Sequence, residues 1–400
     1  MNLEKKLKRN IRIDYLFCFC RNFDLSSAVW VLYMGWRGLP LWQIGIAEGM
    51  FHVTSFLFEV PSGALADLAG RKNVMIWGRV LAAVSSVILL FSKDLWQFLI
   101  GFSISAVSYN LNSGSEEALV YDSMKMLGEE KDYIRVNGRL NVLIEVASGI
   151  AVFLGGVLAE KSYITCYFAA AVAAVVSIVP ALFLTEPQPL KETETKKKVS
   201  LKEHFKISIQ IVRENPAVWK ILLYYPVVET FYAVVFFYGQ QYFAEAGLRR
   251  IQISILMLVT GICSCLGALH SEKILQRFGK NVKYIVSFAM GISILFVSGN
   301  GLVISVAAFF VAGYVNSLIY PIASAALNEL IPSEQRATII SIDSMCFSIA
   351  MVCFFPVTGL VAGAWNLHGA FLILGIIELI LTAVIMWRYK KSNIKTESGS

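Results

Sequence analysis

Long apolar segments recur along almost the whole of this 400-residue sequence. About twelve windows of roughly twenty residues are each long enough to cross a bilayer. They lie at 13–35, 42–66, 73–92, 95–121, 138–159, 162–184, 217–243, 251–271, 282–299, 301–327, 336–362 and 367–387. Backbone groups in lipid must pair within their own segment, so each window predicts a helix. The sequence therefore predicts an all-α membrane protein with twelve transmembrane helices in a lipid bilayer.

The composition excludes other classes of chain. Apolar residues make up 56% and charged residues 16%, with a mean hydropathy of +0.63, which excludes a soluble, disordered or disulfide-scaffold protein. The seven cysteines all lie in apolar windows, and we interpret them as small buried hydrophobes without a disulfide or metal site. The sequence has no phosphate-binding Gly-rich loop and no H-E-x-x-H motif, so we expect neither an enzyme nor a cofactor.

The net charge of +7 is distributed as membrane topology requires. Most Lys and Arg residues fall in alternate loops, beginning with the N-terminus, and this bias is typical of cytoplasmic loops. It predicts that both termini are cytoplasmic and gives no reason to expect a nucleic-acid partner. Arg21 and Asp24 interrupt the first apolar window, which also lacks a small-residue cleavage site. We therefore expect a retained first helix rather than a signal peptide.

A polar stretch containing the run Lys196-Lys197-Lys198 divides the predicted helices into two sets of six. We predict an N-terminal six-helix half at 1–185, a cytoplasmic central loop at 186–215 and a C-terminal six-helix half with a short basic tail at 216–400. Gly63-Ala64-Leu65 and Gly267-Ala268-Leu269 close the second and eighth windows, which is a weak echo between the halves. Two such halves are typical of secondary transporters, in which substrate binds near mid-membrane.

A ten-residue motif begins at the end of the second window and continues into the loop after it. It reads Gly63-Ala64-Leu65-Ala66-Asp67-Leu68-Ala69-Gly70-Arg71-Lys72. The motif resembles the loop 2–3 signature of the major facilitator superfamily, and with the helix number and central loop the resemblance covers the whole chain. It implies an alternating-access transporter whose cytoplasmic gate contains Gly63, Asp67, Gly70, Arg71 and Lys72. The resemblance also gives the partners of this gate, which are Asp122 in the fourth helix and Arg336 at the start of the eleventh.

Physical chemistry adds two expectations for this motif. Gly63 would let a neighbouring helix approach closely, and Asp67 could sit against a helix N-terminus. The plainer interpretation is that Arg71 and Lys72 only mark the cytoplasmic side.

Residues around the motif narrow the resemblance. Glu59-Val60-Pro61-Ser62-Gly63, together with the run from Ser113 to Asp122, resembles the clostridial-type tetracycline efflux branch of bacterial facilitators. That branch implies proton-coupled efflux of organic, drug-like compounds at the cell membrane. Two antiporter features are missing: Ala151-Val152 stands where Gly-Pro would precede Gly155-Gly156, and the fourth helix lacks its usual arginine. Proton-coupled uptake of a nutrient or metabolite is therefore the alternative, and a membrane sensor is a third.

The second window carries a polar stripe. Its members Glu48, His52, Ser55, Glu59 and Ser62 fall within an arc of about 80°, at roughly 100° per residue. Charges kept inside a membrane mark ion or substrate paths, because they are costly to insert. Glu48 and His52 lie one turn apart, so we predict Glu48 as the proton-coupling carboxylate and His52 as a relay. Alternatively, His52 is a hydrogen-bonded core residue and Glu59 belongs to the cytoplasmic charge cluster.

Two further groups are candidate parts of the pathway. Arg21 and Asp24 are three residues apart, so they could form a structural pair, or Arg21 could keep Asp24 ionised for substrate. Tyr225, Glu229 and Tyr232 share one face of the seventh helix. A carboxylate among aromatic rings suits a cationic or amphipathic organic substrate, although such rings also serve as plain packing.

Other polar residues lie within the windows. Asn316 and Tyr320 on the tenth helix are candidates for the opposite wall of the pathway. The remaining members of this class are Asn141, Glu145, Asp343 and Glu378, and Glu378 is the hardest to place because the twelfth helix is usually peripheral in this fold. We expect a monomer whose partners are a small-molecule substrate, protons and the bilayer.

Overall fold

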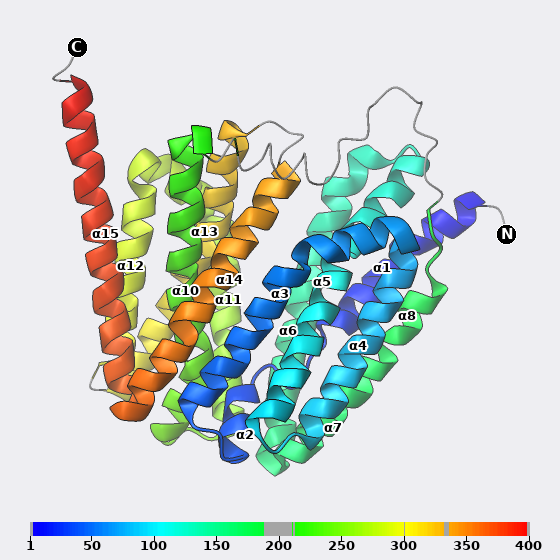
Figure 1. Cartoon of the computed structure of the whole chain (residues 1–400), viewed down its shortest axis with the longest axis horizontal. Helices are drawn as coiled ribbons and strands as arrows, with labels where there is room; N and C mark the ends of the chain where they lie inside the picture. The colour runs from blue at the N-terminus through cyan, green and yellow to red at the C-terminus, as the bar shows by residue number, and fades with distance from the viewer. Residues whose placement is uncertain (1–2, 188–209, 211–212, 300, 332–335, 398–400) are drawn as a thin grey trace. The chain divides into compact units, whose positions relative to one another are not determined.

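The computed structural model describes residues 3–187, 210, 213–299, 301–331 and 336–397. Within these ranges the chain forms helices joined by short connections and no strand, and each predicted window coincides with one helix or a pair (Figure 1). Eight of the described helices are long and apolar enough to cross a membrane on length and hydropathy alone. Most of the predicted central loop, including Lys196-Lys197-Lys198, lies outside the described residues.

The helices before the central loop are α1 Leu3–Asn22, α2 Trp30–Trp36, α3 Leu41–Ala69, α4 Arg71–Phe91, α5 Leu95–Met126, the short 3-10 helix η1 Glu130–Asp132, α6 Tyr133–Lys161, α7 Tyr163–Val176 and α8 Ile178–Phe183. Those after it are α10 Pro216–Glu245, α11 Arg250–Phe278, η2 Gly279–Asn281, α12 Val282–Val297, α13 Leu302–Leu330, α14 Arg336–Ala364 and α15 Leu367–Glu397. The chain divides into two compact units. Unit 1 consists of Met1–Leu39, Ile46–Val199 and Leu248–Leu258, and unit 2 of Pro40–Gly45, Ser200–Gly247 and Val259–Ser400.

Each unit has its own apolar core. In unit 1, α4 packs along α5, and a buried cluster joins residues from α1 to α8: Phe17, Met75, Leu119, Ala181 and Leu184. In unit 2, a buried cluster joins α10, α13 and α14: Val218, Leu222, Leu327, Ile331 and Ile339. Large apolar side chains also cover the surface, where Leu68 is 87% and Val303 is 82% exposed. Such exposure suits a chain whose outer faces meet lipid rather than water.

The prediction of one continuous first helix is wrong. α1 ends at Asn22 and α2 begins at Trp30, so the first window is broken over 23–29. The Asp24 carboxylate accepts hydrogen bonds from the backbone N–H of Ser26 at 2.9 Å and from its hydroxyl at 2.6 Å. Local bonds of this kind compete with helical backbone pairing.

Neighbouring helices hold the break in place. The Cys166 thiol of α7 donates to the Leu25 carbonyl at 3.2 Å. Gly155 of α6 lies against the same carbonyl, so closely that a Cβ at position 155 would collide with it. The break therefore depends on a glycine that lets two backbones meet.

We expect Gly155→Ala to lower the melting temperature by several degrees. The added methyl meets backbone, which cannot rotate away, and overpacking of this kind costs about 1–3 kcal/mol. Gly138→Ala is the control on the same helix, because a Cβ there meets nothing within 4 Å. Thermal unfolding of the detergent-solubilised protein measures both variants. Equal melting temperatures for the two variants would show that the contact with Leu25 does not matter.

Candidate transport and gating sites

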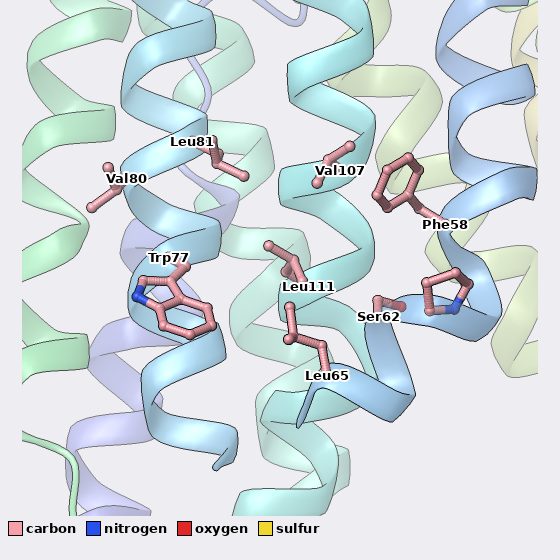
Figure 2. Close-up of a pocket in the computed structure, with 9 residues that line it drawn as sticks. Phe58, Ser62, Leu65, Trp77, Val80, Leu81, Val107 and Leu111 are labelled. Carbon is pink, nitrogen blue, oxygen red and sulfur yellow. The ribbon is translucent and has the colours of Figure 1, made fainter. Parts of the chain in front are cut away.

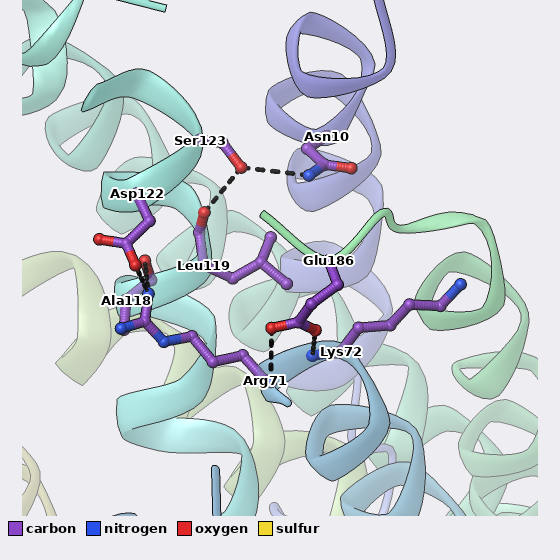
Figure 3. A network of polar contacts seen from close by, with 8 residues as sticks. All are labelled: Asn10, Arg71, Lys72, Ala118, Leu119, Asp122, Ser123 and Glu186. Atoms are coloured by element: carbon purple, nitrogen blue, oxygen red, sulfur yellow. Dashed lines mark hydrogen bonds and ion pairs between the residues drawn. The ribbon is translucent and has the colours of Figure 1, made fainter. Parts of the chain in front are cut away.

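The start of α4 is tied to α5 by an ion pair. The Arg71 guanidinium pairs with the Asp122 carboxylate and donates to the Ala118 carbonyl at 2.7 Å (Figure 3). The side chains of Arg71 and Asp122 are 24% and 38% exposed, so the pair is partly shielded from solvent. The arginine of the motif and its expected partner therefore lie together in unit 1.

A second carboxylate, which the sequence analysis did not single out, lies at the same helix end. Glu186 follows α8 and accepts hydrogen bonds from the backbone N–H groups of Arg71 at 2.9 Å and Lys72 at 2.7 Å (Figure 3). These groups have no partner within the helix, and the helix dipole favours a negative charge there. Gly70 precedes them with φ of 85°, a conformation that a side chain would strain, and a Cβ there would lie 3.2 Å from the Glu186 carboxylate carbon.

The expectation for Gly63 is not met, and several other predicted side chains lie outside the described residues. A Cβ on Gly63 would meet nothing within 4 Å, so the expectation that Gly63 lies in a close helix contact is wrong for this structure. The reason is that α3 bends near this point and has no neighbour beside Gly63. The side chains of Asp67, Tyr320 and Arg336 lie outside the part of the chain that the structure describes.

The polar stripe on α3 contains two close contacts. His52 Nε2 lies 3.5 Å from Glu48 Oε1, and these side chains are only 9% and 11% exposed. One turn further, the Ser55 hydroxyl donates to Asn110 Oδ1 at 2.8 Å, and Asn110 Nδ2 donates back to the Ser55 carbonyl at 2.6 Å. Asn110 of α5 was not predicted, because a partner 55 residues away leaves no local signal.

Glu59, which lies toward the motif end of α3, is less buried than Glu48. Glu59 is half-buried, and its backbone carbonyl accepts a hydrogen bond from the Ser62 hydroxyl at 2.9 Å. Glu48, His52, Ser55 and Ser62 are buried by contrast, so Glu59 is the most exposed member of the stripe.

Arg21 does not pair with Asp24. Its guanidinium forms an ion pair with Glu116 of α5, and the two side chains are 17% and 7% exposed. Arg21 also lies 6.0 Å from the ring centre of Tyr109. Asp24 instead holds the turn at Ser26. The local pairing expected from the spacing of three residues is therefore wrong, because α1 ends between them. Glu116 is thus a buried charged residue that the sequence analysis quoted without assigning.

The face of α10 predicted to meet substrate lies within unit 2. Tyr225 is 7% exposed and packs edge-on against Tyr224, with ring centres 5.5 Å apart. The Tyr232 ring packs against that of Phe236 in a tilted arrangement, with ring centres 5.7 Å apart. Glu229 lies between the two tyrosines along the helix, and Asp343 of α14 is within electrostatic range of it. The structure thus places a second carboxylate, Asp343 of α14, near this face of α10.

Asn316, a candidate on the tenth predicted helix, has a buried polar atom without a hydrogen-bond partner among the described residues. This atom is the side-chain oxygen, and Asn316 lies on α13. Asp343 Oδ1 on α14 is likewise buried and without a hydrogen-bond partner among these residues. Buried polar atoms are normally paired, so these two are candidates for contact with a bound molecule or water.

The sequence profile of the Major Facilitator Superfamily matches residues 16–300 and 284–399. The chain belongs to this superfamily. Members are multi-pass membrane transporters rather than enzymes, which agrees with the helical fold. The prediction of an all-α membrane protein with the facilitator fold is therefore confirmed.

Three proteins similar to this facilitator span different shares of it. It is 21% identical over 408 residues to the uncharacterized MFS-type transporter YxaM of Bacillus subtilis, covering 96% of this chain and 98% of that protein. It is 27% identical over 145 residues to the class H tetracycline resistance protein of Pasteurella multocida, covering 36% and 35%. The crystal structure of the nucleoside transporter NupG shares the fold, with a TM-score of 0.75 at 15% identity over 98% and 100% of the two chains.

A groove of about 530 Å³ opens on the surface of the facilitator's unit 1, where α3 bends beside Ser62 (Figure 2). It lies between α3, α4 and α5 and is lined by Phe58, Pro61, Ser62, Leu65, Trp77, Val80, Leu81, Val107 and Leu111. Pro61 removes one backbone bond of α3, which accounts for the bend. Apart from Ser62 the lining is apolar, so the groove suits a hydrocarbon group and not a charged one.

Proposed function

We propose that this facilitator exports organic, drug-like compounds in exchange for protons by alternating access. The observation that carries the proposal is the buried pair of Glu48 and His52, with 3.5 Å between carboxylate oxygen and imidazole nitrogen. A carboxylate and an imidazole at this separation can share one proton. Buried ionisable pairs on membrane helices are typical of proton relays. A pair that binds a proton in one state and releases it in the next couples transport to a pH gradient.

The substrate we propose is cationic or amphipathic. Glu229 of α10, with Asp343 of α14 in electrostatic range, places two carboxyl groups inside the helices of unit 2. Tyr225 and Tyr232 lie one turn either side of Glu229, and aromatic faces attract organic cations. The similarity of about a third of the chain to a tetracycline resistance protein supports drug-like compounds as the class to test.

We expect Glu229→Gln to weaken binding of an organic cation about tenfold, a loss of about 1.4 kcal/mol, and to leave binding of neutral compounds nearly unchanged. The amide keeps the size of the carboxylate and removes only its charge. Glu245→Gln is the control, since it removes one charge from the exposed end of the same helix. Ligand-induced shifts in melting temperature across cationic and neutral compounds measure the effect. If Glu229→Gln binds cationic and neutral compounds with the same affinities as the wild type does, Glu229 is not part of the substrate site.

The orientation belongs to the same proposal. We assign both termini to the cytoplasmic side of a bacterial cell membrane, on the bias of Lys and Arg toward alternate loops. We further assign a monomer that needs no cofactor. In this orientation the motif ending at Arg71 and Lys72 lies at the cytoplasmic gate.

Transport in everted membrane vesicles tests the direction. With an acidic lumen, a proton-coupled exporter should concentrate the fluorescent cation ethidium inside the vesicles, and dissipating the pH gradient should release it. Proton-coupled uptake of a nutrient, the opposite direction, uses the same chemistry. That alternative predicts that ethidium is not concentrated and that a nutrient such as a nucleoside leaves the vesicles together with protons.

A further inference from the structure

Asp14 of α1 is the most buried carboxylate among the described residues of unit 1, and the proposed path of Glu48 and His52 does not include it. It is 1% exposed, and neither carboxylate oxygen has a hydrogen-bond partner among the described residues. Its place in the helix is well defined. Asn10, Asp14, Cys18 and Arg21 fall within an arc of about 80° on α1, at roughly 100° per residue.

This stripe faces α5 through contacts on both sides of Asp14. On one side, Asn10 Nδ2 donates to the Ser123 hydroxyl at 3.1 Å (Figure 3). On the other, Arg21 pairs with Glu116. Asn10 also exchanges two hydrogen bonds with the backbone of Thr185, so it has no donor left for Asp14. The carboxyl is therefore enclosed between two helix contacts that do not satisfy it.

The titratable groups around Asp14 among the described residues lie on three helices. They are Cys18 and Arg21 on α1, Glu116 and its neighbour Glu117 on α5, and Tyr133 on α6. Helices α7 and α8 also pack on α1 and carry no charged residue. The titratable side chains of α7 lie beside Leu25 and Tyr33 rather than beside Asp14. Arg21 acts on both Glu116 and Asp14, but it is paired with Glu116, on which Arg79 of α4 also acts. An ionised Asp14 would therefore be a buried charge without a hydrogen-bond partner among the described residues.

We propose that Asp14 binds a second transported proton, in addition to the one held by Glu48 and His52. In the arrangement seen here the carboxyl is neutral and occluded. Movement of α1 against α5 during alternating access would bring water or Arg21 to the carboxylate and release the proton. The inference rests on the proposed proton coupling and sets its stoichiometry at two protons in each cycle.

The first test is the limiting accumulation of ethidium in proteoliposomes at an imposed pH difference of one unit, with the membrane potential clamped at zero. Each coupled proton raises that limit about tenfold per pH unit. Asp14→Asn should therefore lower the limit about tenfold and leave ethidium exchange at equal pH intact. Glu378→Gln is the control, because Glu378 is also fully buried with unbonded carboxylate oxygens but has no charged neighbour among the described groups that act on it. An Asp14→Asn limit equal to that of the wild type overturns the inference, whereas no ethidium accumulation by the wild type overturns the proposed function instead.

The second test needs neither a substrate nor a variant. Dicyclohexylcarbodiimide reacts with protonated carboxyl groups in apolar surroundings, and mass spectrometry of the wild-type protein identifies the labelled residue. We expect labelling of Asp14 that declines as the pH is raised, because the group releases its proton. Glu378, which we do not place in the cycle, is also buried with unbonded carboxylate oxygens among the described residues, so its labelling shows whether the reagent reaches buried carboxyls. Absence of Asp14 labelling, or labelling that ignores pH, overturns the inference whatever the substrate is.

Discussion

Glu48→Gln should lower the limiting, pH-driven accumulation of ethidium about tenfold at a pH difference of one unit, because one coupled proton contributes a factor of ten. The amide keeps the size of the carboxylate beside His52, whose Nε2 lies 3.5 Å from Glu48 Oε1 in the wild type, but it cannot carry a proton. Substrate exchange at equal pH needs no proton movement and should continue. Paired measurements of accumulation and exchange in the same proteoliposomes separate the two effects.

A double variant sharpens this prediction. Glu48→Gln combined with Asp14→Asn should abolish pH-driven accumulation and keep exchange, because both proposed proton carriers are neutralised. Glu378→Gln again controls for the loss of a buried carboxylate. A Glu48→Gln variant that concentrates ethidium as well as the wild type would move the coupling site to Glu59 or to unit 2.

Arg71→Ala should slow transport more than tenfold while ethidium binding stays close to the wild-type affinity. The substitution leaves the Asp122 carboxylate and the Ala118 carbonyl without their shared donor, which unties α4 from α5. Because the Asp122 carboxylate is 38% exposed and partly screened by solvent, losing its partner should cost about 1 kcal/mol rather than the larger cost of a fully buried pair. The predicted defect lies in turnover rather than in affinity, since the pair lies at the proposed gate.

Two further variants test this explanation. Lys125→Ala removes a positive charge from the exposed last turn of α5 and should leave transport unchanged. Exchanging the two charges in the double variant Arg71→Asp/Asp122→Arg should recover part of the lost rate. If the exchange restores nothing and Lys125→Ala is equally damaging, the effect of Arg71 comes from net charge and not from the pair with Asp122.

The helices were predictable because their signal is local. Each apolar window is long enough to show its helix without tertiary information, and all twelve windows match helices or helix pairs. The break over 23–29 was missed because no Pro or Gly interrupts that segment. Tertiary contacts decide it, namely the approach of Gly155 to Leu25 and the bond from Cys166.

The same difference between local and long-range contacts decides which parts of the candidate site could be predicted. Glu48 and His52 could be paired from the sequence because a separation of four residues on a helix places them together. Arg21 pairs with Glu116, which is 95 residues away in the sequence. The local pair with Asp24 does not form because α1 ends at Asn22, between the two residues. Glu186 was missed for the same reason, since its bonds to the start of α4 span more than a hundred residues.

The central claim is that substrate and protons cross this facilitator in opposite directions within one cycle. It is tested most directly by loading proteoliposomes with ethidium and a pH-sensitive dye, and diluting them into ethidium-free buffer at the same pH. We predict that outward movement of ethidium acidifies the lumen, whichever way the protein is inserted, and that Glu48→Gln reduces the acidification per ethidium released. Ethidium efflux without a change in lumen pH, or with an alkaline shift, would contradict the account.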